Sequence, residues 1–267
     1  MNSVGTPELE PNLHWHNSAN VLCNYMKEAE YLEKILRNQA IIPRYVIEPL
    51  EYLGVEGLQQ IAFPMTCFCD IPFSKAGNHM TLYGRYGIAL DKQTIIKKFK
   101  VQPIHYMNPE SPLASDFRET FSNYYRKEKR VHQEDKILLD YVLSTLMYMK
   151  PISGLEKING ELQPYIFQDE CEWRYIPSGN FPSSIPLLIK EDQITEKGKN
   201  AYSTVLEKHP ETWIKFAWDD VRYIIVPDES ALKRVIEVIK ELPLGDTKKY
   251  LLISKIEVGN RFVEDLS

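Results

Sequence analysis

Apolar positions along the chain follow two different periods, and these periods separate predicted helices from predicted strands. In "EAEYLEKILRN", Leu32, Ile35 and Leu36 fall on one face of a helix. The same spacing predicts a helix in "ESALKRVIEVIKEL", residues 229–242. Runs of β-prone residues between turn residues predict strands or extended segments at 40–46, 65–73, 86–92, 101–107, 180–189 and 219–228, and a closing strand at 248–258.

The middle of the chain changes to a helical pattern. From Ala114 to about Met149, apolar residues recur at intervals of three and four, which predicts two helices or one broken helix that ends at Pro151. A short helix is also predicted in "SKAGNHMTLYG", with Ser74 as its N-cap. Strands near both ends and helices between them predict an α+β fold with mixed or antiparallel sheets. We expect a loose segment at 1–19 and a single domain at 20–267, with a helical insert at about 113–150.

The stretch "FQDECEWRYIPSG" combines the strand period with charged residues. A strand points alternate side chains to opposite faces, so one face carries the charged row Glu170, Glu172 and Arg174. The other face carries Cys171, Trp173 and Tyr175 and is predicted to join the core. Two interpretations of the charged row stay open. It is either an exposed sheet face whose arginine neutralises its neighbours, or the rim of a catalytic site to which one carboxylate contributes.

Charge and composition narrow the classes of function. The 267 residues carry a formal net charge of -5, which argues against a broad phosphate-binding surface and against direct DNA binding. The basic cluster at Tyr124–Arg130 contains its own acid and is predicted to be a solvated helix face. The sequence has neither a Gly-rich phosphate loop nor an apolar run long enough for a bilayer, and its start does not have the pattern of a signal peptide. We expect a cytoplasmic protein.

The cysteine and histidine patterns do not predict a metal site. Cys67 and Cys69 are separated by one residue, unlike the two-residue spacing that is usual in zinc knuckles. His14 and His16 have a ligand-like spacing, but the loose segment around them supplies no third ligand. The four cysteines, Cys23, Cys67, Cys69 and Cys171, are therefore expected to be reduced thiols.

Three segments resemble the AbiGi family of abortive phage-resistance proteins. The first contains "IL" at 35–36 followed by "PRY" at 43–45, the second contains "CFCDIP" at 67–72 with His79, "YG" and "YGI", and the third contains "ECEWRY" at 170–175. The resemblance covers about residues 20–180, and "CFCDIP" is its most specific part. It implies a role in phage defence, as an antitoxin beside a separate partner toxin.

The order of elements also resembles that of DarT-type ADP-ribosyltransferases, which bind NAD in a cleft between two small sheets. This resemblance implies an ADP-ribosyltransferase-like fold in which Glu172 stabilises positive charge on the ribose and Asn24 contacts the nicotinamide ribose. Such enzymes commonly carry His where this chain has Asn24, whose amide can still bond a hydroxyl. The residues that the resemblance assigns to cofactor binding are Tyr25, Arg44, His79, Tyr83 and Arg174.

Several of these residues have a structural alternative. Arg44 is expected either to clamp a pyrophosphate or to pair with Asp70 or Glu172 inside the fold. His79 is expected either to contact a ligand or to hydrogen-bond within its own neighbourhood. Tyr83 and Tyr86 are expected either to stack on a ligand ring or to pack in the core, and Asp70 to cap or pair within the fold.

Three functions follow from these alternatives. The first is transfer of ADP-ribose from NAD during abortive infection. The second is a non-catalytic antitoxin that binds a partner toxin or another phage or host macromolecule, for which the acidic charge suits a basic partner. The third, a glycosidase or metal hydrolase that uses Glu170 and Glu172, has the least support because carboxylates at i and i+2 do not flank a sugar.

Overall fold

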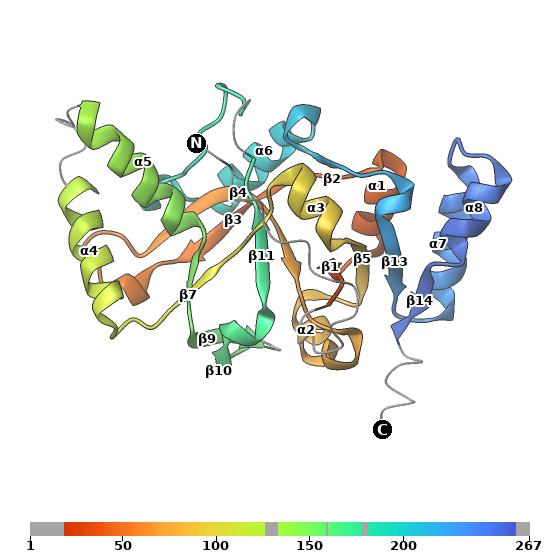
Figure 1. Cartoon of the computed structure of the whole chain (residues 1–267), viewed down its shortest axis with the longest axis horizontal. Coiled ribbons are helices and arrows are strands. Elements are labelled where there is room, and N and C mark those ends of the chain that lie inside the picture. Colours follow the sequence, from red (N-terminus) through yellow and green to blue (C-terminus); the bar gives the residue numbers. More distant parts are fainter. Residues whose placement is uncertain (1–18, 126–132, 159, 178–180, 260–267) are drawn as a thin grey trace, which may run out of the picture.

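A mixed sheet of eight strands organises the molecule, which we describe from a computed structural model that covers residues 19–125, 133–158, 160–177 and 181–259 (Figure 1). The strand order is β14-β13-β5-β1-β4-β11-β6, and β3 pairs with β4 beside this path. Every pairing is antiparallel except that of β13 with β14. The strands are β1 (Val21–Met26), β3 (Arg44–Pro49), β4 (Gln60–Cys69), β5 (Tyr86–Asp91), β6 (Gln102–Pro103), β11 (Glu172–Tyr175), β13 (Val221–Val226) and β14 (Ile256–Val258).

The sheet opens between β1 and β4. β1 pairs with β5 along its whole length, from Val21↔Asp91 to Met26↔Tyr86. With β4, in contrast, its register holds the single pair Cys23↔Cys69. The earlier part of β4, residues 60–65, pairs with β3 instead, so β1 and β4 separate from each other beyond Cys23 and Cys69. We call the opening between residues 24–26 of β1 and 65–67 of β4 the seam.

Two apolar cores lie on the two sides of the seam. On one side, α1 (Ala29–Asn38) and α7 (Glu229–Glu241) pack together and bury Leu36 and Ile239 against β13 and β5. On the other side, α4 (Pro112–Tyr125) and α5 (Gln133–Met147) bury Phe121, Val142 and Leu146 against Phe63 of β4. Figure 1 shows these two groups of helices at opposite ends of the molecule. The α+β prediction is confirmed, and two helices occupy the segment for which helix was predicted.

The remaining elements complete the scaffold. The helices are α2 (Gly77–Tyr83), α3 (Lys92–Phe99), α6 (Glu196–Leu206) and α8 (Asp246–Ile253), with 3-10 turns η1 (Glu51–Leu53), η2 (Phe73–Lys75), η4 (Phe167–Glu170), η5 (Glu191–Gln193), η6 (Pro210–Thr212) and η7 (Trp218–Asp220). Three two-stranded sheets pair β2 (Ala40–Ile41) with β12 (Ile214–Lys215), β7 (His105–Met107) with β8 (Met149–Pro151), and β9 (Ser153–Ile158) with β10 (Glu161–Ile166). None of the helices described has the length and apolar character needed to cross a membrane.

Several local predictions are wrong. The closing segment 248–258 is the helix α8 followed by the short β14, because Leu252 is buried on a helical turn while Tyr250 and Leu251 face outward. Ser74 is not an N-cap, since α2 begins at Gly77 after the turn η2. Residues 101–107 form two short strands, and the expected strand near 189 is reduced to a bridge between Ala62 and Ile189. The predictions for the segment 1–18, for His14 and His16 and for the cluster Tyr124–Arg130 concern side chains outside the described residues.

Candidate functional site

Two adjoining cavities occupy the seam. The first, of about 270 Å³, has mainly apolar walls with Arg44 and Thr66 among its lining residues, and we call it the apolar cavity. The second, of about 150 Å³, contains Glu170 and Glu172 in its wall, and we call it the charged cavity. They share the lining residues Asn24, Tyr25, Val46, Met65 and Cys67. The structure therefore brings Asn24 and Glu172 into one cavity and places Arg44 in the cavity next to it.

The charged row of the sequence faces the interior, so its interpretation as an exposed face is wrong. Glu170 is 2% exposed, Glu172 7% and Arg174 0%. β11 begins at Glu172, and Glu170 ends the turn η4, with Cys171 between them at a φ of 45°. On the opposite face, Cys171 is exposed, so its predicted place in the core is wrong. Trp173 and Tyr175 are half-buried against the core that contains Leu36 and Ile239, as predicted.

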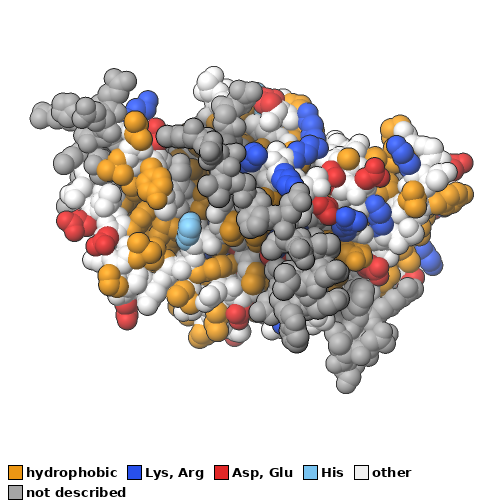
Figure 2. Space-filling view, in the orientation of Figure 1, with side chains coloured by type: hydrophobic (Ala, Val, Ile, Leu, Met, Phe, Trp, Pro, Cys, Tyr) orange, Lys and Arg blue, Asp and Glu red, His pale blue; other side chains and the backbone are white. Residues whose placement is uncertain are grey.

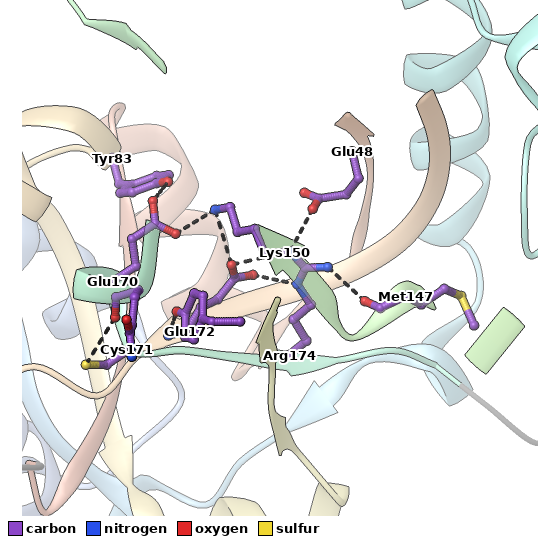
Figure 3. Close-up of polar contacts among 10 residues, drawn as sticks. Glu48, Tyr83, Met147, Lys150, Glu170, Cys171, Glu172 and Arg174 are labelled. Atoms are coloured by element: carbon purple, nitrogen blue, oxygen red, sulfur yellow. Dashed lines mark hydrogen bonds and ion pairs between the residues drawn. The ribbon is translucent and has the colours of Figure 1, made fainter. Parts of the chain in front are cut away.

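Arg174 is the central cation of this row. Its Nε lies 2.7 Å from Oε1 of Glu172, and its Nη2 lies 2.7 Å from Oε2 of Glu48 on β3. Its Nη1 donates to the carbonyl of Met147 at the end of α5, 2.8 Å away (Figure 3). A guanidinium that is fully buried and committed to these partners does not line either cavity. The assignment of Arg174 to cofactor binding is therefore wrong, and its contact with Glu172 makes it a support for that carboxylate.

Lys150 of β8 links the two carboxylates of the charged cavity. Its Nζ lies 2.6 Å from Oε2 of Glu170 and 3.4 Å from Oε2 of Glu172. Figure 3 shows the resulting chain of contacts, which continues from Glu170 to the hydroxyl of Tyr83 on α2. Because one ammonium contacts both carboxylates, they share one wall of the cavity. The glycosidase alternative lacks the arrangement it needs, in which two carboxyl groups flank a sugar.

The surroundings push the two carboxylates toward different protonation states. Burial opposes the ionisation of Glu172, but the charges of Arg174 and Lys150 outweigh it and lower the pKa of Glu172 to about 2. Burial dominates at Glu170 and raises its pKa, although Lys150 and Tyr83 act in the other direction. Glu172 is thus a fixed anion, and Glu170 is the carboxyl group that a change in charge nearby can protonate.

Three aromatic rings form a second side of the charged cavity. The rings of His79 and Tyr83 on α2 are 4.5 Å apart, and Tyr25 on β1 lies 5.4 Å from His79. Nδ1 of His79 is buried and has no hydrogen-bond partner among the described residues, so the predicted hydrogen bond within its own neighbourhood is not made at this atom. Burial, together with the charge of Lys150, lowers the pKa of His79 to about 4, which keeps the ring neutral at pH 7.

The remaining predicted residues differ in their surroundings. The Asn24 amide donates to the carbonyl of Cys67, 2.8 Å away across the seam. Arg44 is exposed, with its guanidinium 5.2 Å from the ring centre of Tyr31, and the alternative of a buried pair with Asp70 or Glu172 is wrong. Asp70 pairs with Lys92, in agreement with the prediction that it pairs within the fold. Tyr86 packs against the first core.

Sequence reasoning missed Lys150, Glu48 and Thr66. Thr66 is 5% exposed, lines the apolar cavity and has a hydroxyl without a partner among the described residues. Lys150 lies in "MKPIS", where a single lysine between β-prone residues gives no signal of its own. The charged row itself would have indicated a second cation only if its face had been known to be buried, because two buried glutamates require more positive charge than Arg174 alone supplies.

The charged cavity is lined by carboxylates and aromatic rings. Within the described ranges, no group of three or more His, Cys, Asp or Glu side chains is placed to hold a metal ion. All four cysteines are free thiols, and burial together with Glu172 raises the pKa of Cys67. The arrangement presents a fixed carboxylate beside flat rings, which suits a ligand that carries or develops positive charge.

Comparisons with known proteins identify the family. Residues 39–227 match the family described as "Putative abortive phage resistance protein AbiGi, antitoxin". The chain is also 31% identical over 250 residues to "Abortive phage resistance protein AbiGi" from Lactococcus lactis subsp. cremoris, covering 85% of this chain and 99% of that protein. No solved structure matches. The family match covers more than half of the chain, and the chain belongs to the AbiGi family.

Proposed function

We propose that the protein binds NAD in the two cavities of the seam and transfers ADP-ribose from it as its part in abortive phage resistance. The observation that carries this proposal is that Glu172, Asn24 and three aromatic rings line one cavity where the sheet splits. The resemblance of the element order to DarT-type ADP-ribosyltransferases supports it, because those enzymes bind NAD between two small sheets. Membership of the AbiGi family supports the role in phage defence.

The residues present fit such a ligand. Buried polar atoms without partners lie in both cavities, the Thr66 hydroxyl in one and Nδ1 of His79 in the other, and a ligand would satisfy them. Ligand pockets typically span roughly 300–1,000 Å³, so a dinucleotide needs both cavities. We assign its nicotinamide riboside half to the charged cavity and its phosphates to the side of Arg44.

Each residue then has a distinct task. NAD would supply the bond between nicotinamide and ribose: nicotinamide leaves with the bonding electrons, and the ribose carbon bonds to a nucleophile of the acceptor or to water, which gives up a proton. Glu172, held as an anion, stabilises the positive charge that develops on the ribose carbon. The amide of Asn24 faces the same cavity and orients the ribose, and Tyr83 and His79 offer ring faces to the nicotinamide. Arg44, exposed at the apolar cavity, provides a guanidinium for the pyrophosphate.

Thermal shift and product analysis test this function. NAD at 5 mM is expected to raise the melting temperature of the wild type, because a ligand that binds the folded state stabilises it. Asn24→Ala is expected to reduce that shift, and Glu172→Gln to abolish release of nicotinamide, measured by chromatography. Glu237→Gln, on the exposed face of α7, serves as the matched control. Absence of both a thermal shift and nicotinamide release in the wild type would contradict the proposal.

A second function, that of an antitoxin that binds a partner toxin, is favoured by the family's description as an antitoxin and by one surface of the molecule. Leu113, Ile137 and Tyr141 are more than 60% exposed on α4 and α5. Figure 2 shows apolar side chains gathered over these helices. Exposed apolar side chains that gather on one face are typical of a protein-binding site.

Co-expression with the partner toxin that this second function requires tests it. If the protein acts as an antitoxin, Ile137→Ser combined with Tyr141→Ser is expected to lose protection, whereas Glu172→Gln keeps it. Loss of protection with Glu172→Gln alone would favour the enzyme.

A further inference from the structure

We propose that Lys150 is a positioning residue of the charged cavity, whose ammonium fixes Glu170 and Glu172 on one wall and whose loss makes Glu170 take up a proton in its place. Its relevance to ligand binding rests on the proposed NAD site. The exchange of charge itself depends on the fold alone, so the two can be tested separately.

The position of Lys150 supports this role. Its side chain is 14% exposed, and its Nζ contacts Glu170 at 2.6 Å and Glu172 at 3.4 Å. The same atom lies 4.6 Å from the ring centre of Phe167, which holds the ammonium from a third direction. Lys150 comes three residues after Met147, whose carbonyl accepts a hydrogen bond from Arg174. The end of the helical insert therefore contacts Arg174 through Met147 and the two carboxylates through Lys150.

The balance of charge in the network makes the ammonium necessary. Three carboxylates (Glu48, Glu170, Glu172) face two cations (Lys150, Arg174), which leaves one excess negative charge if all are ionised. Without Lys150 the excess would be two. Buried excess charge is relieved by protonation. Glu170 is the group that takes the proton, because burial already raises its pKa and Lys150 is the main group opposing that shift.

Among the described residues, the other titratable groups around Glu170 and Lys150 do not supply a replacement cation. They are Tyr83 and His79 on α2, Tyr106 on β7, Tyr165 on β10, Tyr52 on η1 and Cys67 on β4. Burial is the largest cause of the pKa shift in each of them. It raises the pKa of the tyrosines and of Cys67 and lowers that of His79, so all are neutral at pH 7.

The proposal gives a pH dependence with a definite sign. In Lys150→Met, the folded-state pKa of Glu170 lies further above its unfolded value than in the wild type. A carboxyl group raised in this way contributes stability at low pH that is lost as the pH rises through its folded pKa. The stability deficit of Lys150→Met relative to wild type therefore grows from pH 5 to pH 8.

Calorimetric melting of five proteins between pH 5 and pH 8 tests the proposal: wild type, Lys150→Met, Lys150→Arg, Glu170→Gln and the double variant Lys150→Met/Glu170→Gln. Lys150→Met is expected to melt roughly 10 °C below wild type at pH 8 and much closer to it at pH 5. The double variant is expected to lose this pH dependence and to melt above Lys150→Met at pH 8. Lys150→Arg is expected to behave like the wild type because it keeps the charge.

Two results would overturn the proposal: a deficit of Lys150→Met that is equal at every pH, or a double variant that melts no higher than Lys150→Met at pH 8. Lys240→Met, which removes an exposed ammonium from a pair on α7, controls for loss of a lysine. Repeating the series with 5 mM NAD separates this proposal from the proposed function. If NAD stabilises no variant and not the wild type, the NAD site is wrong, whereas the pH pattern still decides the role of Lys150.

Discussion

Arg174 donates two hydrogen bonds to the carboxylate of Glu172, with Nε 2.7 Å from Oε1 and Nη2 3.3 Å from Oε2. The two residues are neighbours on the same buried face of β11. Adjacent positions on one strand face are close enough for such a contact, but they rarely hold opposite charges away from water. Here the removal of both charges from water is offset by Glu48, Lys150 and the carbonyl of Met147. The site is therefore a single unit whose members depend on one another.

Removal of the central cation is expected to be severe. Arg174→Met leaves Glu172 and Glu48 buried without their main partner, which costs about 3–5 kcal/mol of unfolding free energy. Arg222→Met is the matched control, because Arg222 pairs with Asp91 at 2.8 Å on the surface and its loss is expected to cost under about 1 kcal/mol. Urea unfolding measures both. Equal losses in the two variants would mean that the buried network adds no special stability.

Glu172 is expected to shape the acid limb of the stability curve. Its folded pKa of about 2 lies below the ordinary value of 4.5, so its contribution is fully present above about pH 4.5 and is lost as the pH falls through about 2. Glu172→Gln is expected to have a lower melting temperature at pH 7 and a flatter fall between pH 4.5 and pH 2. Parallel curves for the two proteins across this window would contradict the lowered pKa.

His79 is expected to stay neutral down to about pH 4. The unfolded chain binds a proton at this residue near its ordinary pKa of 6.5, so protonation favours unfolding as the pH falls from 6.5 toward 4. NMR titration of histidine ring signals, assigned with His79→Gln, measures this directly. A midpoint for His79 near 6.5 in the folded protein would show that its ring is hydrated rather than enclosed by Tyr25 and Tyr83.

Gly84 is expected to tolerate no side chain. Its φ is 117°, and a Cβ there would lie 2.1 Å from the carbonyl oxygen of Met26 at the end of β1. Gly84→Ala is expected to cost more than about 3 kcal/mol because both backbone strain and a backbone clash oppose it. Gly57→Ala, also at positive φ (74°) but with nothing within 4 Å, is expected to cost about 1 kcal/mol. Comparable melting temperatures of the two variants would contradict the clash.

The sequence predicted which residues share a face of β11 but not which face is covered. Alternation separates Glu172 and Arg174 from Trp173 and Tyr175, because the strand period is two, whereas Glu170 lies in the turn η4 before the strand. The decision between inside and outside depends on distant segments. Glu48 lies 126 positions before Arg174 and Met147 lies 27 before it, and no local pattern announces either contact.

Helix and strand predictions failed where apolar residues are consecutive. "YLLI" at 250–253 fits a strand, but in the structure it forms the end of α8, with Leu252 alone fully buried. Predictions succeeded where the period was clear, as in α1 and α7. The proximity of Asn24 to Glu172 was expected from the resemblance to DarT-type enzymes, and both residues line one cavity.

The seam has a mechanical consequence. A sheet resists bending through its ladders, yet the β5–β1 and β4–β11 halves of this one are joined by the pair Cys23↔Cys69 and by the side chain of Asn24. We expect amide hydrogens along this joint to exchange with solvent sooner than those of the flanking ladders, because fewer backbone hydrogen bonds hold it. A ligand that binds between β1 and β4 would contact both halves of the sheet. Its binding is therefore expected to slow deuterium uptake in both strands, whatever its chemistry.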